Sequence, residues 1–447
     1  MKIQDRFRAT RAPYACVLFL FALFSAQTTA LIESDSTGQK KAKPIEVSSD
    51  QFLWRVDLHS MGYPDNGNQL QGRRDLDEFD TVDFVSEGVV AASFITQEPT
   101  PPLEHRGDPN GAPLYRLHAV FLGAASGKVL RTLDWPLENP YAGIFPLYEG
   151  RFLFLSTQRI VLYSADWTPV KELPLPQLQQ PHSYLAGIAE SPSGKVLVIR
   201  FHQGSLTQCI RILTDSLEGA EEPCEITEQF TVSDEAMATS RIGKDRTEED
   251  NFGVAITHDL PIQKQSYRRN QYGILIREMG KDARILCFCY SSVPQFINNQ
   301  MIAAYSGNYL WLLSVTGDLK FGQAYVTSED SSSIDNGGRP VRPSADGRRF
   351  ALALNIPLED MPIKGMGARV VSRDFPGDPP ATFPDRVDVF DLPSGQWVYI
   401  LRNKKSRLPK IMGLGLSPGG EMLTIDSGGV IQVYALPPAS STSPSIH

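Results

Sequence analysis

The sequence predicts an all-β protein in which one small antiparallel sheet is repeated around a closed ring. A polar turn ending in Gly recurs ahead of a short apolar run, at 191–199, 344–352 and 417–425. A second phrase, clearest at 387–395, is an apolar strand that closes on another Gly turn. Between these phrases, β-branched and aromatic runs are broken about every 8–12 residues by Gly, Pro, Asn or Asp, which is typical of all-β chains.

Grouping the phrases divides the chain into seven units of about four strands each. Six are expected at 80–136, 143–175, 183–217, 226–288, 294–326 and 340–403, and the last runs from about 410 to Leu436. The last unit shows three strands, so we expect the run at 52–58 to supply its fourth and to close the ring without a free edge. Six or eight units are alternatives. A β-solenoid is another, although its shorter, more uniform period fits poorly.

Individual strands follow from the same pattern of apolar runs between turn residues. The expected strands are 81–85, 89–95, 117–122 and 129–133 in the first unit, 144–147, 151–155, 160–163 and 169–173 in the second, 230–232, 236–239, 272–277 and 284–288 in the fourth, and 309–315 in the fifth.

The turn phrase Ser-x-(Asp/Ser/Gly)-Gly, followed by an apolar strand and a second Gly turn, resembles the repeats of WD40-like and YVTN-type β-propeller proteins. The resemblance covers about 52–436, but the Gly-His and Trp-Asp dipeptides of WD40 repeats are absent. It implies a β-propeller, most simply of seven four-stranded blades.

The N-terminus has the pattern of a secretory signal peptide. Basic residues precede a run of about a dozen mainly apolar residues at 15–26, and small residues at 28–30 offer a cleavage site. The expected organisation is a signal peptide at 1–30, a disordered linker at 31–49, the propeller at 50–437 and a disordered tail at 438–447. This predicts a secreted or periplasmic protein with no membrane span after signal removal. The alternative is an uncleaved N-terminal anchor.

Four cysteines follow the expected cleavage site. In an exported chain such cysteines can form disulfides. Cys209 and Cys224 flank an acidic, turn-rich segment, so a disulfide between them is a candidate. Cys287 and Cys289 alternate along a predicted strand and are expected to be small buried side chains rather than metal ligands.

Long insertions fall in only two kinds of connection. Three interrupt the link between the second and third strands of a unit (97–114, 241–271 and 357–385), and two link successive units (60–78 and 327–339). In a four-stranded antiparallel blade both kinds leave from the same end, so we expect one loop-rich face that binds a partner. Candidate binding residues in these loops are of types enriched at interfaces: Tyr63, Arg73, Arg74, His105, Arg106, Tyr267, Arg268, Arg269, Arg373 and Phe375.

Catalytic and cofactor motifs give little support for an enzyme. Gly415-Leu416-Ser417-Pro418-Gly419 matches the pattern of a hydrolase nucleophile elbow, but here it coincides with the recurrent turn, and the only later His is His447. No tight metal-ligand spacing or phosphate-binding Gly-rich motif is present, so no cofactor and no metal are expected. The net charge of −8 disfavours a nucleic-acid binder.

We therefore predict an exported, non-enzymatic binding module whose loop-rich face contacts a protein or a cell-envelope ligand. The alternative is a propeller hydrolase or lactonase-like enzyme, with a site at the axial funnel composed of residues from several blades.

Overall fold

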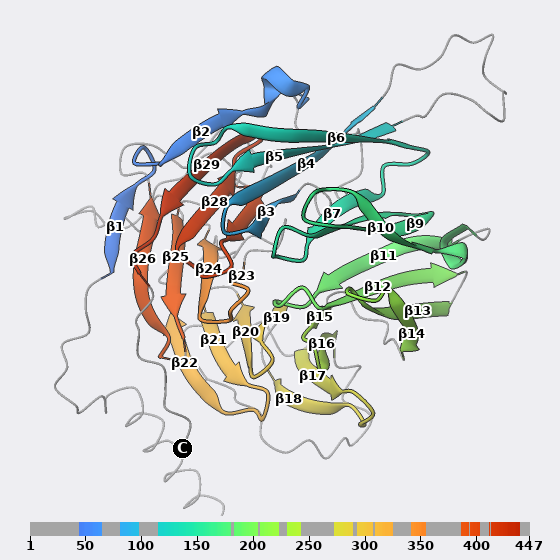
Figure 1. Cartoon of the computed structure of the whole chain (residues 1–447). Helices are drawn as coiled ribbons and strands as arrows, with labels where there is room; N and C mark the ends of the chain where they lie inside the picture. The colour runs from blue at the N-terminus through green and yellow to red at the C-terminus, as the bar shows by residue number, and fades with distance from the viewer. Residues whose placement is uncertain are drawn as a thin grey trace, which may run out of the picture. The chain divides into compact units, whose positions relative to one another are not determined.

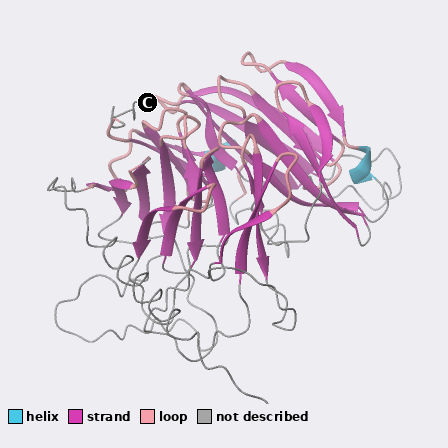
Figure 2. Ribbon diagram, turned by 90° about the horizontal axis from the view of Figure 1, so that it is seen from below, coloured by secondary structure: helices cyan, strands magenta, loops and turns pink. Residues whose placement is uncertain are grey.

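The computed structural model describes residues 44–64, 81–97, 115–179, 183–203, 206–222, 230–242, 272–288, 293–306, 309–324, 341–354, 386–392, 394–402, 411 and 413–438. Within these ranges the regular structure is almost entirely strand. Helix is confined to the short 3₁₀ turns η1 (Leu58–Met61) and η4 (Pro176–Gln179) (Figure 2). None of the described helices is long and apolar enough to span a bilayer.

The strands form seven separate sheets arranged as the blades of a ring (Figure 1). Blade 1 consists of β3 (Thr81–Ser86), β4 (Val89–Gln97), β5 (Tyr115–Gly123) and β6 (Val129–Leu137). Blade 2 consists of β7 (Ala142–Pro146), β8 (Phe152–Ser156), β9 (Arg159–Tyr163) and β10 (Pro169–Pro174). Blade 3 consists of β11 (Ser183–Glu190), β12 (Val196–Gln203), β13 (Leu206–Leu213) and β14 (Glu218–Glu222). The seven-unit prediction is confirmed.

Blades 4 to 7 repeat the same antiparallel order. They are β15 (Phe230–Val232), β16 (Ala236–Ile242), β17 (Tyr272–Glu278), β18 (Arg284–Phe288); β19 (Val293–Asn298), β20 (Met301–Ser306), β21 (Tyr309–Ser314), β22 (Leu319–Ala324); β23 (Val341–Pro343), β24 (Arg349–Leu354), β25 (Arg386–Asp391), β26 (Gln396–Arg402); and β27 (Gly413–Leu416), β28 (Met422–Asp426), β29 (Val430–Ala435), β2 (Trp54–Asp57).

The recurrent turn phrase has a shared hydrogen-bond pattern that explains its sequence. In each copy the Ser Oγ accepts the backbone N–H five residues on, at 3.0–3.1 Å for Ser191, Ser344 and Ser417. The Ser carbonyl also accepts the N–H of the turn Gly, which takes a positive φ of 66–72°. A left-handed backbone is available to Gly without a steric penalty. Ser417 is therefore a buried turn residue, as the sequence predicts.

Seven apolar clusters form the core, and each one spans two neighbouring blades. The cluster between blades 7 and 1 contains Trp54 and Val433 from one side and Phe84 and Phe94 from the other. The inner strands also contact one another around the ring, in the order β11, β15, β19, β23, β27, β3 and β7. Burial of apolar surface between blades, rather than within isolated sheets, is therefore what closes the ring.

The chain ends meet in blade 7, as predicted. Strand β2 pairs antiparallel with β29, with Trp54 opposite Val433 and Asp57 opposite Val430 (Figure 1). The indole Nε1 of Trp54 donates to the carbonyl of Ala124 at 2.6 Å, which ties the closing strand to blade 1 as well. The N-terminal strand thus contacts both blades at the closure.

The segment expected to be a disordered linker contains a strand, so that expectation is wrong for Ile45–Ser48. These residues form β1, which pairs parallel with β26 as a fifth strand of blade 6. The Ser49 N–H donates to the Arg402 carbonyl, and the Tyr434 hydroxyl donates to the Ser49 carbonyl. A four-residue edge strand with only two apolar side chains gives no periodicity, because its stability comes from backbone pairing with an existing edge.

Candidate binding face

Strand order divides the ring into two faces. The turns joining the first to the second strand and the third to the fourth are short and leave one end, which we call the short-turn face. The connections from second to third strand, and from one blade to the next, leave the other end, which we call the loop-bearing face. All five long insertions belong to the second group, so the topology brings their ends to a single face, as predicted.

Tyr63 was predicted to be a binding residue of the loop-rich face, but it is a buried core residue. It is only 3% exposed and packs among the core residues of the cluster between blades 7 and 1, with its ring 5.2 Å from that of Phe94. The reason is η1, which precedes it and turns the chain back so that the Tyr63 N–H donates to the carbonyl of Leu58. The other candidates (Arg73, Arg74, His105, Arg106, Tyr267, Arg268, Arg269, Arg373 and Phe375) lie outside the described residues.

Blade 3 presents exposed apolar side chains on the loop-bearing face. Tyr184, near the start of β11, is 56% exposed, and Leu206, which begins β13, is 61% exposed. The Tyr184 ring lies 4.9 Å from the imidazole of His202, its cross-strand neighbour. The His202 Nδ1 in turn lies 2.9 Å from Thr207 Oγ1. Burial, with a smaller contribution from the Arg200 charge, lowers the pKa of His202, which favours a neutral ring.

A polar hollow lies between blades 1 and 2 at the same end of the strands. Trp135 lines it, stacked on Phe154 with ring centroids 4.8 Å apart. The Trp135 Nε1 donates to the Tyr163 hydroxyl at 3.0 Å. On the rim, Asn139 donates from Nδ2 to Thr157 Oγ1 at 2.8 Å. The hollow is an open depression with a half-buried aromatic wall, which can accept one side chain of a partner.

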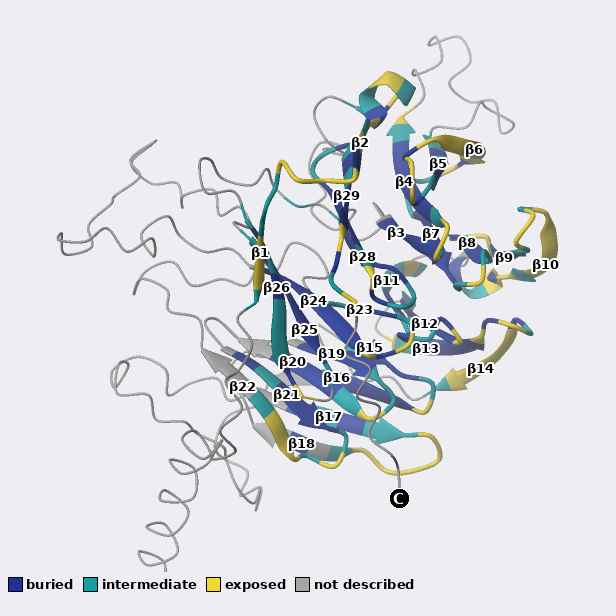
Figure 3. Cartoon of the chain, turned by 60° about the vertical axis from the view of Figure 1, so that its left-hand side comes forward, coloured by how far each residue is buried: buried dark blue, intermediate teal, exposed yellow. Residues whose placement is uncertain are grey.

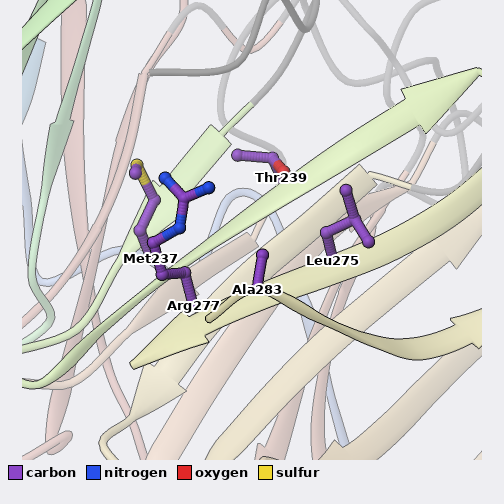
Figure 4. Close-up of a pocket in the computed structure, with 5 residues that line it drawn as sticks. All are labelled: Met237, Thr239, Leu275, Arg277 and Ala283. Carbon is purple, nitrogen blue, oxygen red and sulfur yellow. The ribbon is translucent and has the colours of Figure 1, made fainter. Parts of the chain in front are cut away.

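A second, smaller hollow lies on blade 4 and is lined by Met237, Thr239, Leu275, Arg277 and Ala283 (Figure 4).

The inner strands hold the polar pair Arg342 and Asp83, near the ring axis where the sequence left a composite enzyme site open. Arg342 donates from Nε to the Leu414 carbonyl at 3.0 Å, and its Nη1 lies 3.9 Å from Asp83 Oδ2. Arg342 therefore links the inner strands of blades 6, 7 and 1. Across the described residues, no group of three or more His, Cys, Asp or Glu side chains is arranged to hold a metal ion.

Burial decreases from the centre of the ring to its rim (Figure 3). Strands such as β8 are wholly buried, whereas most of β6, β10 and β14 is exposed. Four-stranded antiparallel blades surround an axis, are joined by apolar clusters and are closed by an N-terminal strand. In architecture the chain is a seven-bladed β-propeller.

The propeller is similar to the WD40 domain of Neurospora crassa Pan2, at 10% identity and a TM-score of 0.48, over 88% of this chain and 98% of that chain. No protein-family model matches the sequence, and no curated protein matches it. The seven-sheet arrangement itself therefore supports the assignment.

The sequence did not single out Tyr184, Leu206 or Trp135 as binding residues. Each lies in a strand of the structure (β11, β13 and β6), where an alternating pattern assigns a side chain to one side of a sheet but not to solvent.

Proposed function

We propose that this propeller is an exported interaction module that binds a protein ligand through its loop-bearing face over blades 1 to 3. The observation that supports this most directly is the exposure of Tyr184 on β11 and of Leu206 on β13, both at the loop-bearing end of blade 3. Large exposed Tyr and aliphatic side chains lose little conformational entropy on binding and bury considerable apolar area. The Trp135 hollow, between blades 1 and 2, adds a second contact point on the same face.

Export is supported by the basic and apolar N-terminal pattern and by Cys209, which is disulfide-bonded. Disulfides persist in oxidising compartments and are rare in the cytosol. Mass spectrometry of the purified protein tests this part of the proposal: a mature chain beginning near Leu31 supports export with cleavage. A chain that retains residues 1–30 would contradict cleavage and favour an anchor.

The binding face is tested by paired substitutions of equal exposure on opposite faces. Tyr184→Ala and Leu206→Ser change the loop-bearing face. Val170→Ser and Met279→Ser change the short-turn side, where these residues are 62% and 55% exposed. Each variant is used as bait for proteins of the envelope fraction, followed by titration of the recovered partner with purified bait. We expect the first pair to weaken binding by about 10-fold or more, since hot-spot truncations cost about 2 kcal/mol, and the second pair to bind normally.

Replacement of residues 244–270 by a short Gly-Ser linker tests the contribution of the long insertion in blade 4. The linker joins β16 to β17, which remain paired with each other in the propeller. Normal binding by this variant together with normal binding by Tyr184→Ala would overturn the assignment of the face. Loss of binding by Val170→Ser or Met279→Ser would instead assign the partner to the short-turn side.

A further inference from the structure

Three side chains from neighbouring strands of blade 1 form a continuous hydrogen-bonded relay near the loop-bearing end. The Thr96 Oγ1 lies 2.8 Å from His118 Nε2, and His118 Nδ1 lies 2.5 Å from Asp134 Oδ1. The register accounts for this arrangement: His118 on β5 is opposite Asp134 on β6 and opposite Phe94 on β4. Thr96 stands two residues beyond Phe94 and so shares its side of the sheet.

The partners of the two ring nitrogens suit one tautomer of His118. A carboxylate only accepts hydrogen bonds, so the tautomer with the proton on Nδ1 donates to Asp134 and leaves Nε2 as the acceptor. The hydroxyl of Thr96 is then the donor to Nε2. Phe94 stacks on the imidazole with centroids 5.0 Å apart and the planes inclined by 23°, which restricts rotation of the ring. A hydroxyl, an imidazole and a carboxylate in this order are the parts of an activated nucleophile.

Arg116 adds a positive charge at the nucleophile. It is directly opposite Thr96 in the β4–β5 register, on the same side of the sheet. The Cβ atoms of such cross-strand partners are about 4.5–5.5 Å apart. A guanidinium at this position can stabilise negative charge that develops on an oxygen next to Thr96 Oγ1.

We propose that Thr96 is a nucleophile for acyl transfer, with esters as the class of substrate, His118 as general base and acid, and Asp134 as the positioning residue. Thr96 Oγ bonds to the ester carbonyl carbon while its proton passes to His118 Nε2, and Arg116 balances the charge on the carbonyl oxygen. The bond from carbon to the leaving alcohol then breaks, and that alcohol takes the proton from His118. Water, deprotonated by His118, releases the carboxylic acid and restores Thr96. This site lies on the outer strands of one blade, away from the ring axis.

Blade 3 contains an internal control. The Thr207 Oγ1 is 2.9 Å from His202 Nδ1, so it resembles the first half of the relay. The charge that acts on His202 is that of Arg200, a cation, rather than a carboxylate. A cation disfavours the imidazolium that must form when the hydroxyl loses its proton. Thr207 is therefore expected to be unreactive although its geometry toward histidine is similar.

The test uses the full chain with two probes, a fluorophosphonate for covalent labelling and p-nitrophenyl acetate for turnover. We expect mass spectrometry to place the label on Thr96 and not on Thr207. Thr96→Val should abolish labelling and ester hydrolysis, and His118→Gln should slow both by about 100-fold or more, the usual contribution of a general base. Thr207→Val should leave both unchanged.

A purely structural role for the relay predicts a different set of results. In that case the variants lower the melting temperature, and Thr96 of the wild-type protein reacts with neither probe. Absence of reaction at wild-type Thr96 would show that the proposal is wrong. Equal labelling of Thr96 and Thr207 would also overturn it. Because the comparison of Thr96 with Thr207 is made in the wild-type protein, it remains decisive even where a variant fails to fold. Asp134→Asn should lower the labelling rate and alter its pH profile with Thr96 still present, which distinguishes positioning from mere loss of stability.

Discussion

Arg349 and Asp391 form a fully buried ion pair at the junction of blades 6 and 7. The Arg349 Nε donates to Asp391 Oδ1 at 2.6 Å. The Nη1 of the same guanidinium donates to the carbonyls of Gly420 and Pro437, at 2.7 and 2.6 Å. One side chain therefore links the second strand of blade 6 to a turn of blade 7 and to the residues that follow the last strand. This contact fixes the C-terminal end of the ring on the short-turn face.

Removal of this cation should destabilise the propeller strongly. Arg349→Met removes the guanidinium that pairs with the buried Asp391 carboxylate, and we expect a loss of about 3–5 kcal/mol in the free energy of unfolding. Arg349→Met with Asp391→Leu should lose less than Arg349→Met alone, because the buried negative charge is removed together with the positive one. As a control, Arg159→Ala breaks the exposed pair with Glu172 and should cost less than about 1 kcal/mol. Denaturant unfolding measures all three, and equal losses for Arg349→Met and Arg159→Ala would contradict the structural role given to Arg349.

Substitutions at two adjacent glycines in the blade 7 turn allow the cost of backbone strain to be measured apart from the cost of steric overlap. Gly428 and Gly429 both have positive φ, at 66° and 83°. A Cβ at Gly428 would meet nothing within 4 Å, whereas one at Gly429 would overlap the Tyr63 ring. Gly428→Ala should therefore cost only the left-handed backbone penalty, about 1–2 kcal/mol. Gly429→Ala should cost about 1–3 kcal/mol more, from overpacking. Thermal unfolding of both variants checks the difference, and equal melting temperatures would show that Tyr63 does not press on this turn.

The fold could be predicted because the turn that marks each repeat is formed by residues close together in the sequence. The Ser191, Ser344 and Ser417 turns each satisfy their own backbone groups within six residues, so each copy is visible in the sequence. Closure by the N-terminal strand could also be predicted, from a blade with one strand too few. Strand β1 could not, because a short parallel edge strand depends on the edge of β26 that receives it.

The candidate sites could not be predicted from the sequence because they depend on the register in which neighbouring strands pair. Thr96, His118 and Asp134 are far apart in the chain and meet only because β4, β5 and β6 align as they do. A shift of one residue would turn each side chain to the opposite side of the sheet. Tyr63 failed as a predicted binding residue for a related reason: composition suggests an anchor, but η1 directs the ring into the core.

The partner of Cys209 is predicted to be Cys224. Cys209 is buried in β13 and disulfide-bonded, and it stands opposite Glu222, two residues before Cys224. Non-reducing peptide mapping should recover a single linked peptide that contains Cys209 and Cys224, with Cys287 and Cys289 as free thiols. Replacement of both linked cysteines by Ala should cost about 3 kcal/mol, as for a closed loop of about 15 residues. A link from Cys209 to either remaining cysteine would show that the pairing is wrong.

Asp426 should make the stability of the propeller decrease as the pH rises toward neutrality. Burial raises its pKa to about 7 from the ordinary 3.8, against the opposing effects of the Gly429 N–H, which donates to Oδ1 at 2.8 Å, and of His59. Between about pH 4 and pH 7 the folded chain therefore holds a proton that the unfolded chain has lost. The free energy of unfolding falls across this interval, by at most about 4 kcal/mol, and is constant above it with respect to this group.

Asp426→Asn keeps an acceptor for Gly429 but cannot ionise, so the difference between its free energy of unfolding and that of wild type should grow in its favour from pH 4 to pH 7. Asp166→Asn tests the opposite pH dependence, because the pKa of Asp166 is lowered rather than raised. Hydrogen bonds from Ser164 and Thr168 lower the pKa of Asp166, so its contribution is present above its ordinary pKa and is lost as the pH falls. Denaturant unfolding checks both signs, from pH 2 to pH 5 for Asp166→Asn and from pH 4 to pH 8 for Asp426→Asn. A difference for Asp426→Asn that stays constant across this range would mean that Asp426 is already ionised in the folded propeller at pH 4, with its charge balanced by groups such as His59.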